Sequence, residues 1–591
     1  MPRLISAALL AIGLTLVNGS ASDSHGAIKK PGHSAETTGK QPNFVFIMTD
    51  DQDLHLHSLD YMPKLQRHIG DEGTVFERHF CTIAVCCPSR VSLMTGKLAH
   101  NTNVTDVYPP YGGYPKFIAE GHNDNYLPIW LQDAGYNTYY TGKFLNAHST
   151  SNYNNPYPKG WNGTNFLLDP STYSYWNSTF QHNHDKPVVS DGYSTDLISS
   201  HSLDFIKEAH ASDRPFFLGI TPIAPHAKTA EVEGSSIPAF TDPVPAPRHA
   251  NKFPNARIPR GGNFNPDTQS GASWILDLPQ LNASEVTYMD GYYRHRLQSL
   301  QAVDDLVESV VKKLEDYGLL ENTYIFYTSD NGYHAGQHRM VPGKGCPYEE
   351  DINIPMLVRG PGVPKGRKVD FVTSHTDIAA TLFDLAGIPL REDFDGTPIP
   401  LTASEMRGAK SDPRREHVSV EYWGTNLQEG DIGRVSPTGA GVVYYNNTYK
   451  AMRVIGDSYN LFYSVWCTNE HELYDLALTF PQNDPYQMRN LINTKKTLLG
   501  RDIKKVISRL DALLLVLKSC KGSDCTLPWQ VLHPNKKVTS LSEALSPKYD
   551  KFYAAQPDIS FSACELGYLP GSEGPQEGYA YRRDGDWSYW A

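Results

Sequence analysis

Two adjacent cysteines, a proline, a serine and an arginine at residues 86–90 form the stretch of this sequence with the greatest chemical potential. Pro88 has no N–H and a preset φ, so it suits the first turn of a helix. Cys86 would then lie at a helix N-terminus, where the dipole favours an anion and lowers the pKa of a thiol. Arg90, one turn on, offers a planar pair of donors for a tetrahedral oxyanion such as sulfate. As an isolated pair, Cys86 and Cys87 could instead be disulfide partners in an exported protein.

Oxygen-bearing side chains follow two apolar, strand-like runs at residues 43–48 and 323–328. Such runs are typical of strands buried on both faces of a sheet, and open α/β sheets bind ligands at the carboxyl ends of their strands. The four side chains are Asp50, Asp51, Asp330 and Asn331. Three carboxylates and an amide oxygen suit calcium or magnesium, and no set of thiolates or imidazoles indicates zinc. Either pair alone could be ordinary turn chemistry.

Three basic side chains lie close to the ends of further strand-like runs: Lys143, His226 and Lys344. A lysine is usually a solvated surface group, and a lone histidine can be structural. Their shared position beside successive strands favours a site that binds an anion and transfers protons.

The run at residues 86–96 resembles the signature of the type I sulfatases: cysteine, any residue, proline, serine, arginine, three spacer residues, leucine or methionine, threonine and glycine. Every fixed position is satisfied. The resemblance implies that a formylglycine-generating system oxidises Cys86 to formylglycine, the nucleophile. It also implies a calcium ion, with magnesium as the alternative, held by Asp50, Asp51, Asp330, Asn331 and position 86. The implied sulfate contacts come from Arg90, Lys143 and Lys344.

The mechanism that the resemblance implies is nucleophilic catalysis aided by a metal. One hydroxyl of hydrated formylglycine attacks sulfur and displaces the alcohol or phenol. Loss of the second hydroxyl proton then expels sulfate and restores the aldehyde. His226 is expected to protonate the leaving oxygen, with Lys344 beside it.

The sequence departs from many arylsulfatases at Leu145, where they carry a histidine that interacts with the formylglycine hydroxyl. The form Lys143-Phe144-Leu145-Asn146 is similar to the N-acetylglucosamine-6-sulfatase branch. The base that releases sulfate is therefore open. Candidates just past the metal motif are His334 and His338, with His148 less favoured.

Aryl sulfates are the leading substrate prediction, and a sulfated sugar is the close alternative. A phosphodiesterase or phosphatase of the same superfold would need further Asp and His ligands for two zinc ions and a Thr or Ser nucleophile, which are not evident. A lectin-like binder of sulfated glycans would not need Cys86.

The N-terminus indicates an exported protein. Residues 1–21 read as a signal peptide, with Arg3 before an apolar stretch, and residues 22–41 as a polar leader. No later stretch is apolar enough to predict a membrane span. Glycosylation sequons begin at Asn103, Asn162, Asn177, Asn282 and Asn446.

The net charge of −12 argues against nucleic acid as a partner. Eight cysteines leave at least one unpaired if Cys86 is modified, and Cys520 and Cys525 can close a small loop.

The elements that would position these side chains alternate between strands and helices over residues 42–405, which predicts an α/β catalytic domain with a mostly parallel sheet flanked by helices. The resemblance implies an alkaline-phosphatase-like fold. Helices are expected over residues 303–314 and 504–518, and from a Thr376 N-cap to Gly387. The stretches at 149–180 and 231–279 are expected to be long, structureless binding loops. Shorter strands predict a smaller C-terminal α+β domain over residues 410–591.

Overall fold

A ten-stranded mixed sheet forms the centre of the computed structural model, which describes residues 40–230, 232, 238–411, 415–430, 443–477, 483–583 and 586–589. The predicted signal peptide and nearly all of the predicted leader lie outside the described residues. The strands of this sheet are β1 (Asn43–Thr49), β2 (Thr74–Phe76), β4 (Asn137–Lys143), β5 (Gly163–Leu167), β6 (Thr179–His182), β7 (Val188–Val189), β8 (Phe216–Thr221), β11 (Thr323–Ser329), β12 (Met356–Arg359) and β13 (Arg367–Val369).

The strand order is β13-β2-β12-β11-β1-β8-β4-β5-β6-β7. The central run β11-β1-β8-β4-β5 is parallel, while β12, β6 and β7 join it antiparallel to their neighbours. The predicted parallel sheet is thus present at the centre, with antiparallel strands towards both edges. Because the parallel strands share one direction, their carboxyl ends meet at one edge.

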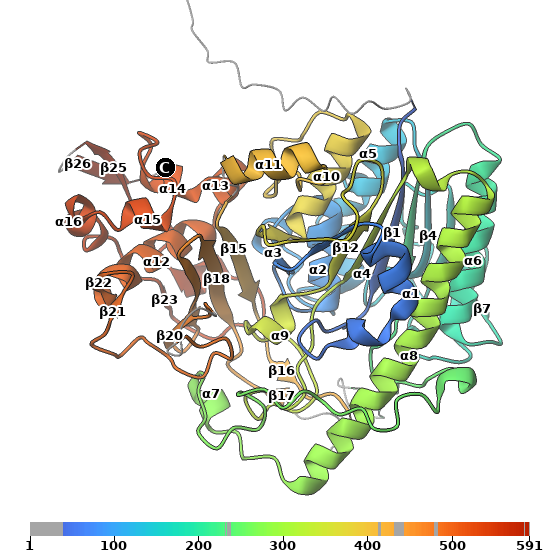
Figure 1. The fold of residues 1–591 in the computed structure, drawn as a ribbon, viewed down its shortest axis with the longest axis horizontal. Helices are drawn as coiled ribbons and strands as arrows, with labels where there is room; N and C mark the ends of the chain where they lie inside the picture. The colour runs from blue at the N-terminus through green and yellow to red at the C-terminus, as the bar shows by residue number, and fades with distance from the viewer. Residues whose placement is uncertain are drawn as a thin grey trace, which may run out of the picture. The chain divides into compact units, whose positions relative to one another are not determined.

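Strand β1 is buried on both faces, as its apolar run predicted. Successive side chains of a strand point to opposite faces, so Phe44 and Phe46 pack in one apolar cluster and Val45 and Ile47 in another. The first cluster includes side chains of α2 (Cys86–Thr95), α5 (Leu127–Asp133) and α10 (Thr376–Ala386). The second includes side chains of α6 (Ser194–His210) and α8 (Ala283–Asp316), which pack on each other (Figure 1). Helices therefore cover both faces of the sheet.

The predicted helices are present, with small differences at their ends. Helix α8 contains the predicted 303–314 segment but starts earlier, at a capping box formed by Asn282 and Glu285. In α10, Thr376 is the first helical residue and His375 takes the N-cap position, contrary to the predicted Thr376 cap. Gly387 ends this helix with a φ of 69°, a conformation that glycine adopts without strain.

The expectation of two structureless insertions was wrong. Residues 149–180 contain β5, a strand of the main sheet, and lead into β6. The described part of residues 231–279 contains short elements: β10 (Ala239–Thr241), η4 (Pro247–His249) and α7 (Ser273–Leu276). Strand β5 has the sequence Gly-Thr-Asn-Phe-Leu, so it lacks the continuous apolar run by which β1 and β11 were predicted.

A second, four-stranded antiparallel sheet follows in the order β15 (His417–Tyr422), β18 (Tyr449–Gly456), β19 (Tyr459–Trp466) and β20 (His471–Asp475). One face packs on α12 (Ile503–Leu517), and the other shares an apolar cluster with Phe80 and Ile352, which come from segments before residue 405. Helix α11 (Ala403–Ser411) spans the predicted boundary between 405 and 410. The division into two domains there stays a prediction.

Shorter elements complete the described chain. They include η1 (Ser58–Tyr61), α1 (Pro63–Leu65), η2 (Gln66–Gly70), β3 (His79–Phe80), α3 (Ala99–Thr102), α4 (Gly113–Ala119), β9 (Lys228–Ala230), α9 (Glu349–Ile352), β14 (Thr373–Ser374), β16 (Asn426–Leu427), β17 (Val443–Tyr444), α13 (Ser523–Thr526), α14 (Pro528–Leu532), α15 (Leu541–Ala544), α16 (Asp550–Tyr553), β25 (Tyr579–Arg583) and β26 (Asp586–Tyr589). Within the described ranges, no helix is both long and apolar enough to span a bilayer.

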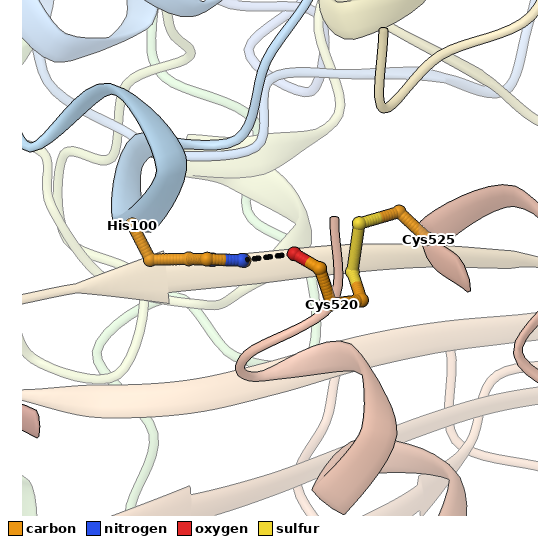
Figure 2. A group of neighbouring side chains, drawn as sticks. All are labelled: His100, Cys520 and Cys525. Atoms are coloured by element: carbon orange, nitrogen blue, oxygen red, sulfur yellow. Dashed lines mark hydrogen bonds between the residues drawn. A yellow bond between two sulfur atoms is a disulfide. The ribbon is translucent and has the colours of Figure 1, made fainter. Parts of the chain in front are cut away.

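The predicted disulfide between Cys520 and Cys525 is present, and a second joins Cys467 to Cys564. The other four cysteines, Cys86 among them, are free and buried. The carbonyl oxygen of Cys520 accepts a hydrogen bond from His100 Nε2 at 2.8 Å (Figure 2). Nδ1 of the same imidazole lies 2.8 Å from Glu421 Oε2. Because both sulfurs are bonded to each other and both ring nitrogens have partners, this group joins α3 to the C-terminal helices and is not a metal centre.

Candidate active site

Cys86 is the first residue of α2, as predicted, and its side chain lies among charged groups. Its Sγ is 3.4 Å from Asp50 Oδ1 and 3.4 Å from Lys344 Nζ. The prediction that the helix N-terminus lowers the pKa of this thiol was wrong. Complete burial, followed by the negative charge of Asp50, raises the pKa well above its usual value, and Lys143 and Lys344 only partly oppose that rise. With no cation bound, an unmodified thiol at this position is therefore protonated at neutral pH.

The four predicted oxygen ligands come together where β1 and β11 end side by side. Thr49 pairs with Ser329 in the parallel register, so the residues that follow each strand meet. The Asp51 N–H donates to Asp330 Oδ1 at 3.1 Å, and Asn331 Nδ2 donates to Asp51 Oδ1 at 2.8 Å. All four side chains are fully buried.

Two lysines and an arginine compensate this negative charge. Lys143 Nζ lies 2.7 Å from Asp50 Oδ2, and Lys344 Nζ lies 2.5 Å from both oxygens of Asp51. Arg90 donates from Nε to Asp330 at 2.9 Å. Burial alone would raise the pKa of Asp50, but Lys143, His226 and Arg90 together lower it to about 2. Asp51 likewise has a lowered pKa: burial opposes this, and Lys344 and His226 outweigh it. Both carboxyls are therefore ionised at neutral pH.

His226 follows β8 and faces the same group. Its Nδ1 lies 2.6 Å from the carbonyl oxygen of Ala227, which can only accept, so Nδ1 carries a proton. Nε2 lies 3.5 Å from Asp51 Oδ2. One ligand atom from each of Asp50, Asp51, Cys86 and His226 lies within 4.8 Å of the others.

The three candidate bases make their described contacts with residues other than Cys86. His334 Nδ1 lies 2.8 Å from Asp351 Oδ1, and His338 stacks on Tyr348. His148 is buried among aromatic rings, where desolvation lowers its pKa to about 3. Among the described residues, no hydrogen bond or ion pair joins any of these three to Cys86.

Position 145 does not face the site either. Leu145 is buried in the same apolar cluster as Phe144 and Phe166. The next side chain, Asn146, donates from Nδ2 to the hydroxyl of Tyr173 at 2.7 Å. At the end of β4, therefore, the Lys143 side chain lies in the site and Leu145 packs in the core. Asn146 contacts Tyr173, which the sequence analysis did not single out.

Three residues of the site escaped the sequence analysis: Tyr173, Arg296 and Glu429. Arg296, fully buried on α8, donates to the Asp51 carbonyl oxygen at 2.6 Å and to Asp53 Oδ1 at 3.1 Å. Glu429 Oε1 lies 3.4 Å from Lys344 Nζ. Arg296 had one usable signal, a lone arginine on the apolar side of a long helix. Tyr173 and Glu429 lie outside every motif.

The residues present fit a hard divalent cation. Asn331 Oδ1 is buried and has no hydrogen-bond partner in the described part of the chain. An orphaned amide oxygen beside three carboxylates is a donor set that calcium or magnesium prefers. The four predicted ligands all offer oxygen atoms, and Cys86 is the one thiol in the described group of possible ligands that contains Asp50 and Asp51.

Comparisons with known proteins agree with this geometry. A family model described as Sulfatase matches residues 42–388. An arylsulfatase of Volvox carteri is 40% identical over 577 residues, which cover 93% of this chain and 85% of the relative. An N-acetylglucosamine-6-sulfatase of Capra hircus is 32% identical over 513 residues, covering 83% and 85%. A protein solved in complex with its substrate D-glucosamine-2-N,6-O-disulfate has the same fold: TM-score 0.59, 21% identity, 77% of this chain and 94% of that one.

Arg296 tests how far α8 supports the metal motif. Arg296→Ala should lower the free energy of unfolding by about 3 kcal/mol, because it leaves the buried Asp53 carboxylate and the Asp51 carbonyl short of a donor. Arg294→Ala on the same helix is the matched control, since Arg294 is only half-buried and donates to one carbonyl. Urea denaturation measures both variants. Equal losses for the two would contradict the support assigned to Arg296.

Proposed function

The chain belongs to the sulfatase family and is a sulfuric ester hydrolase, and we propose that its substrates are aryl sulfates, cleaved by a formylglycine made from Cys86. The observation that carries this proposal is the position of Cys86 at the start of a buried helix, in contact with Asp50 and Lys344. The arylsulfatase relative, similar over nearly the whole chain, supports the aryl class of substrate.

The cationic side chains would bind the sulfate group. A sulfate ester carries negative charge on its non-bridging oxygens, and preorganised donors in a buried site stabilise such charge more than water does. Lys143 and Lys344 reach the carboxylates from separate segments, and Arg90 Nη2 is buried without a hydrogen-bond partner in the described residues. These three groups would orient the ester with its sulfur facing position 86.

Asp50, Asp51, Asp330 and Asn331 would hold the divalent cation. A bound cation supplies Lewis acidity, which lowers the pKa of a nearby hydroxyl and polarises sulfate oxygens. Hydrated formylglycine supplies two hydroxyls on one carbon, the first to attack sulfur and the second to release sulfate. We expect calcium, with magnesium as the alternative.

His226 would act as the general acid. Its Nδ1 proton is held by the Ala227 carbonyl, so Nε2 is the nitrogen that faces the site. In the imidazolium form, which the neighbouring Asp51 carboxylate favours, Nε2 carries a second proton and can give it to the leaving oxygen, which leaves a neutral imidazole. A base role for His334 or His338 stays a prediction, and it would require action through other groups.

A sulfated sugar remains the second candidate substrate. The 32% identical N-acetylglucosamine-6-sulfatase and the Leu145-Asn146 form support it. We further propose that the protein is exported through its predicted signal peptide, since the two disulfides are typical of an oxidising compartment.

Leaving-group dependence tests both the substrate class and the acid. Wild-type protein should hydrolyse nitrophenyl sulfate with a higher kcat/KM than N-acetylglucosamine 6-sulfate. His226→Ala should slow the sugar ester by roughly 10²-fold or more, and the nitrophenyl ester much less, because nitrophenolate can depart without a proton. His334→Ala and His338→Ala, assayed alongside, should slow both esters alike if either residue is the base.

Steady-state kinetics on the two esters give the answer. Equal losses for His226→Ala on both substrates would remove it as the general acid. Faster wild-type turnover of the sugar ester would replace the aryl proposal with the sugar one.

Metal removal tests the oxygen site. Chelation should suppress turnover, and calcium or magnesium should restore it better than zinc, because hard cations prefer carboxylate and amide oxygens. Asp330→Ala should reproduce the chelated protein, whereas Asp124→Ala, at an exposed carboxylate paired with Lys159, should not. Turnover and metal content are measured on the same samples. Full activity after chelation, with two tightly held zinc ions, would support the phosphatase-like alternative instead.

A further inference from the structure

Tyr173 contacts two of the basic residues of the site, although it belongs to no motif. Its ring stacks on the imidazole of His226, with 4.1 Å between ring centroids and 26° between planes. Lys143 Nζ lies 4.7 Å from the centroid of the same ring. The side chain is only 6% exposed, so these contacts are shielded from water. Tyr173 therefore links the end of β4 to the residue that follows β8.

The hydroxyl end of Tyr173 is fixed as well. It accepts a hydrogen bond of 2.7 Å from Asn146 Nδ2, and Asn146 is itself held because its carbonyl oxygen accepts from the Tyr114 N–H at 2.8 Å. Burial raises the pKa of Tyr173 well above its usual value, and the negative charge of Asp50 adds to that rise. The phenol stays neutral, and its ring is anchored at both ends.

The imidazole of His226 needs such an anchor. Its backbone is held by the Tyr175 hydroxyl, which donates to the His226 carbonyl oxygen at 2.7 Å, and Nδ1 is held by Ala227. Nε2 lies 3.5 Å from Asp51, too far for a strong hydrogen bond. A ring fixed at one nitrogen can still tilt about that contact, and a flat neighbour on its face restricts the tilt.

We propose that Tyr173 is a positioning residue that holds the imidazole of His226 with Nε2 towards Asp51 and position 86. The proposal deepens the proposed function, because it rests on His226 as the acid. Stacking of this kind contributes a modest free energy, but a small displacement of a proton donor lowers its rate of transfer strongly. Tyr173 would thus affect kcat more than KM.

The test compares two substitutions on two aryl esters. Tyr173→Leu removes the ring and should lower kcat for phenyl sulfate about tenfold, with a smaller effect on nitrophenyl sulfate and little change in KM. Tyr173→Phe keeps the ring, loses only the hydroxyl, and should stay within about threefold of wild type. If Tyr173→Leu does not fold, Tyr173→Met fills more of the space and takes its place.

Tyr157→Leu is the matched control. Tyr157 lies in the same segment and its ring packs on another histidine, His184, with centroids 4.0 Å apart. No described contact joins Tyr157 to the charged cluster around Cys86, so this variant should keep the wild-type ratio between the two esters.

A double-mutant cycle decides whether Tyr173 acts through His226. In the His226→Ala background, Tyr173→Leu should cause almost no further loss of kcat on phenyl sulfate. An undiminished tenfold loss in that background would overturn the proposal, and so would equal losses on both esters or loss of activity in Tyr173→Phe. If His226→Ala itself slows both esters alike, the acid assignment fails first, and the positioning role fails with it.

Discussion

The burial of three carboxylates in one small volume is the constraint on which the rest of this structure depends. Asp50, Asp51 and Asp330 are all fully buried at the carboxyl ends of β1 and β11. Like charges so close repel one another, and burial makes each ion more costly. The site is therefore stable only with opposing charge, which the buried Arg90 and Lys143 and the half-buried Lys344 supply directly and a divalent ion would increase. The same positive groups then suit a sulfate anion.

The fold delivers those cations from distant parts of the chain. Lys143 ends a strand of the parallel core, and Arg90 lies one turn into α2, so both are held by rigid elements. Lys344 lies on a long connection and depends on the C-terminal region: Asn426 Nδ2 donates to its carbonyl oxygen at 2.8 Å, and Glu429 faces its ammonium group. The smaller sheet and its neighbouring segments therefore contribute to the order of the site as well as to the core.

Local patterns predicted much of this arrangement. The apolar runs correctly predicted strands β1 and β11. Because parallel strands end at one edge of a sheet, Asp50 and Asp330 were also correctly predicted to lie close together. The main error was the prediction of a lowered thiol pKa at Cys86, and burial explains it. The helix dipole acts on this thiol, but desolvation and the charge of Asp50 outweigh the dipole and raise the pKa. Tyr173 and Arg296 were missed because their contacts join segments far apart in sequence, and no spacing rule encodes such a pair. The strand within residues 149–180 was hidden for a related reason, since its polar residues are satisfied only by the folded sheet.

The chemical state of position 86 is the most direct test of this account. Trypsin should release residues 79–90, a peptide that holds Cys81, Cys86 and Cys87. After reduction and alkylation of active protein, mass spectrometry should find two alkylated cysteines and an aldehyde at position 86 that reacts with a hydrazide. A fully active preparation in which all three cysteines are alkylated would contradict the account.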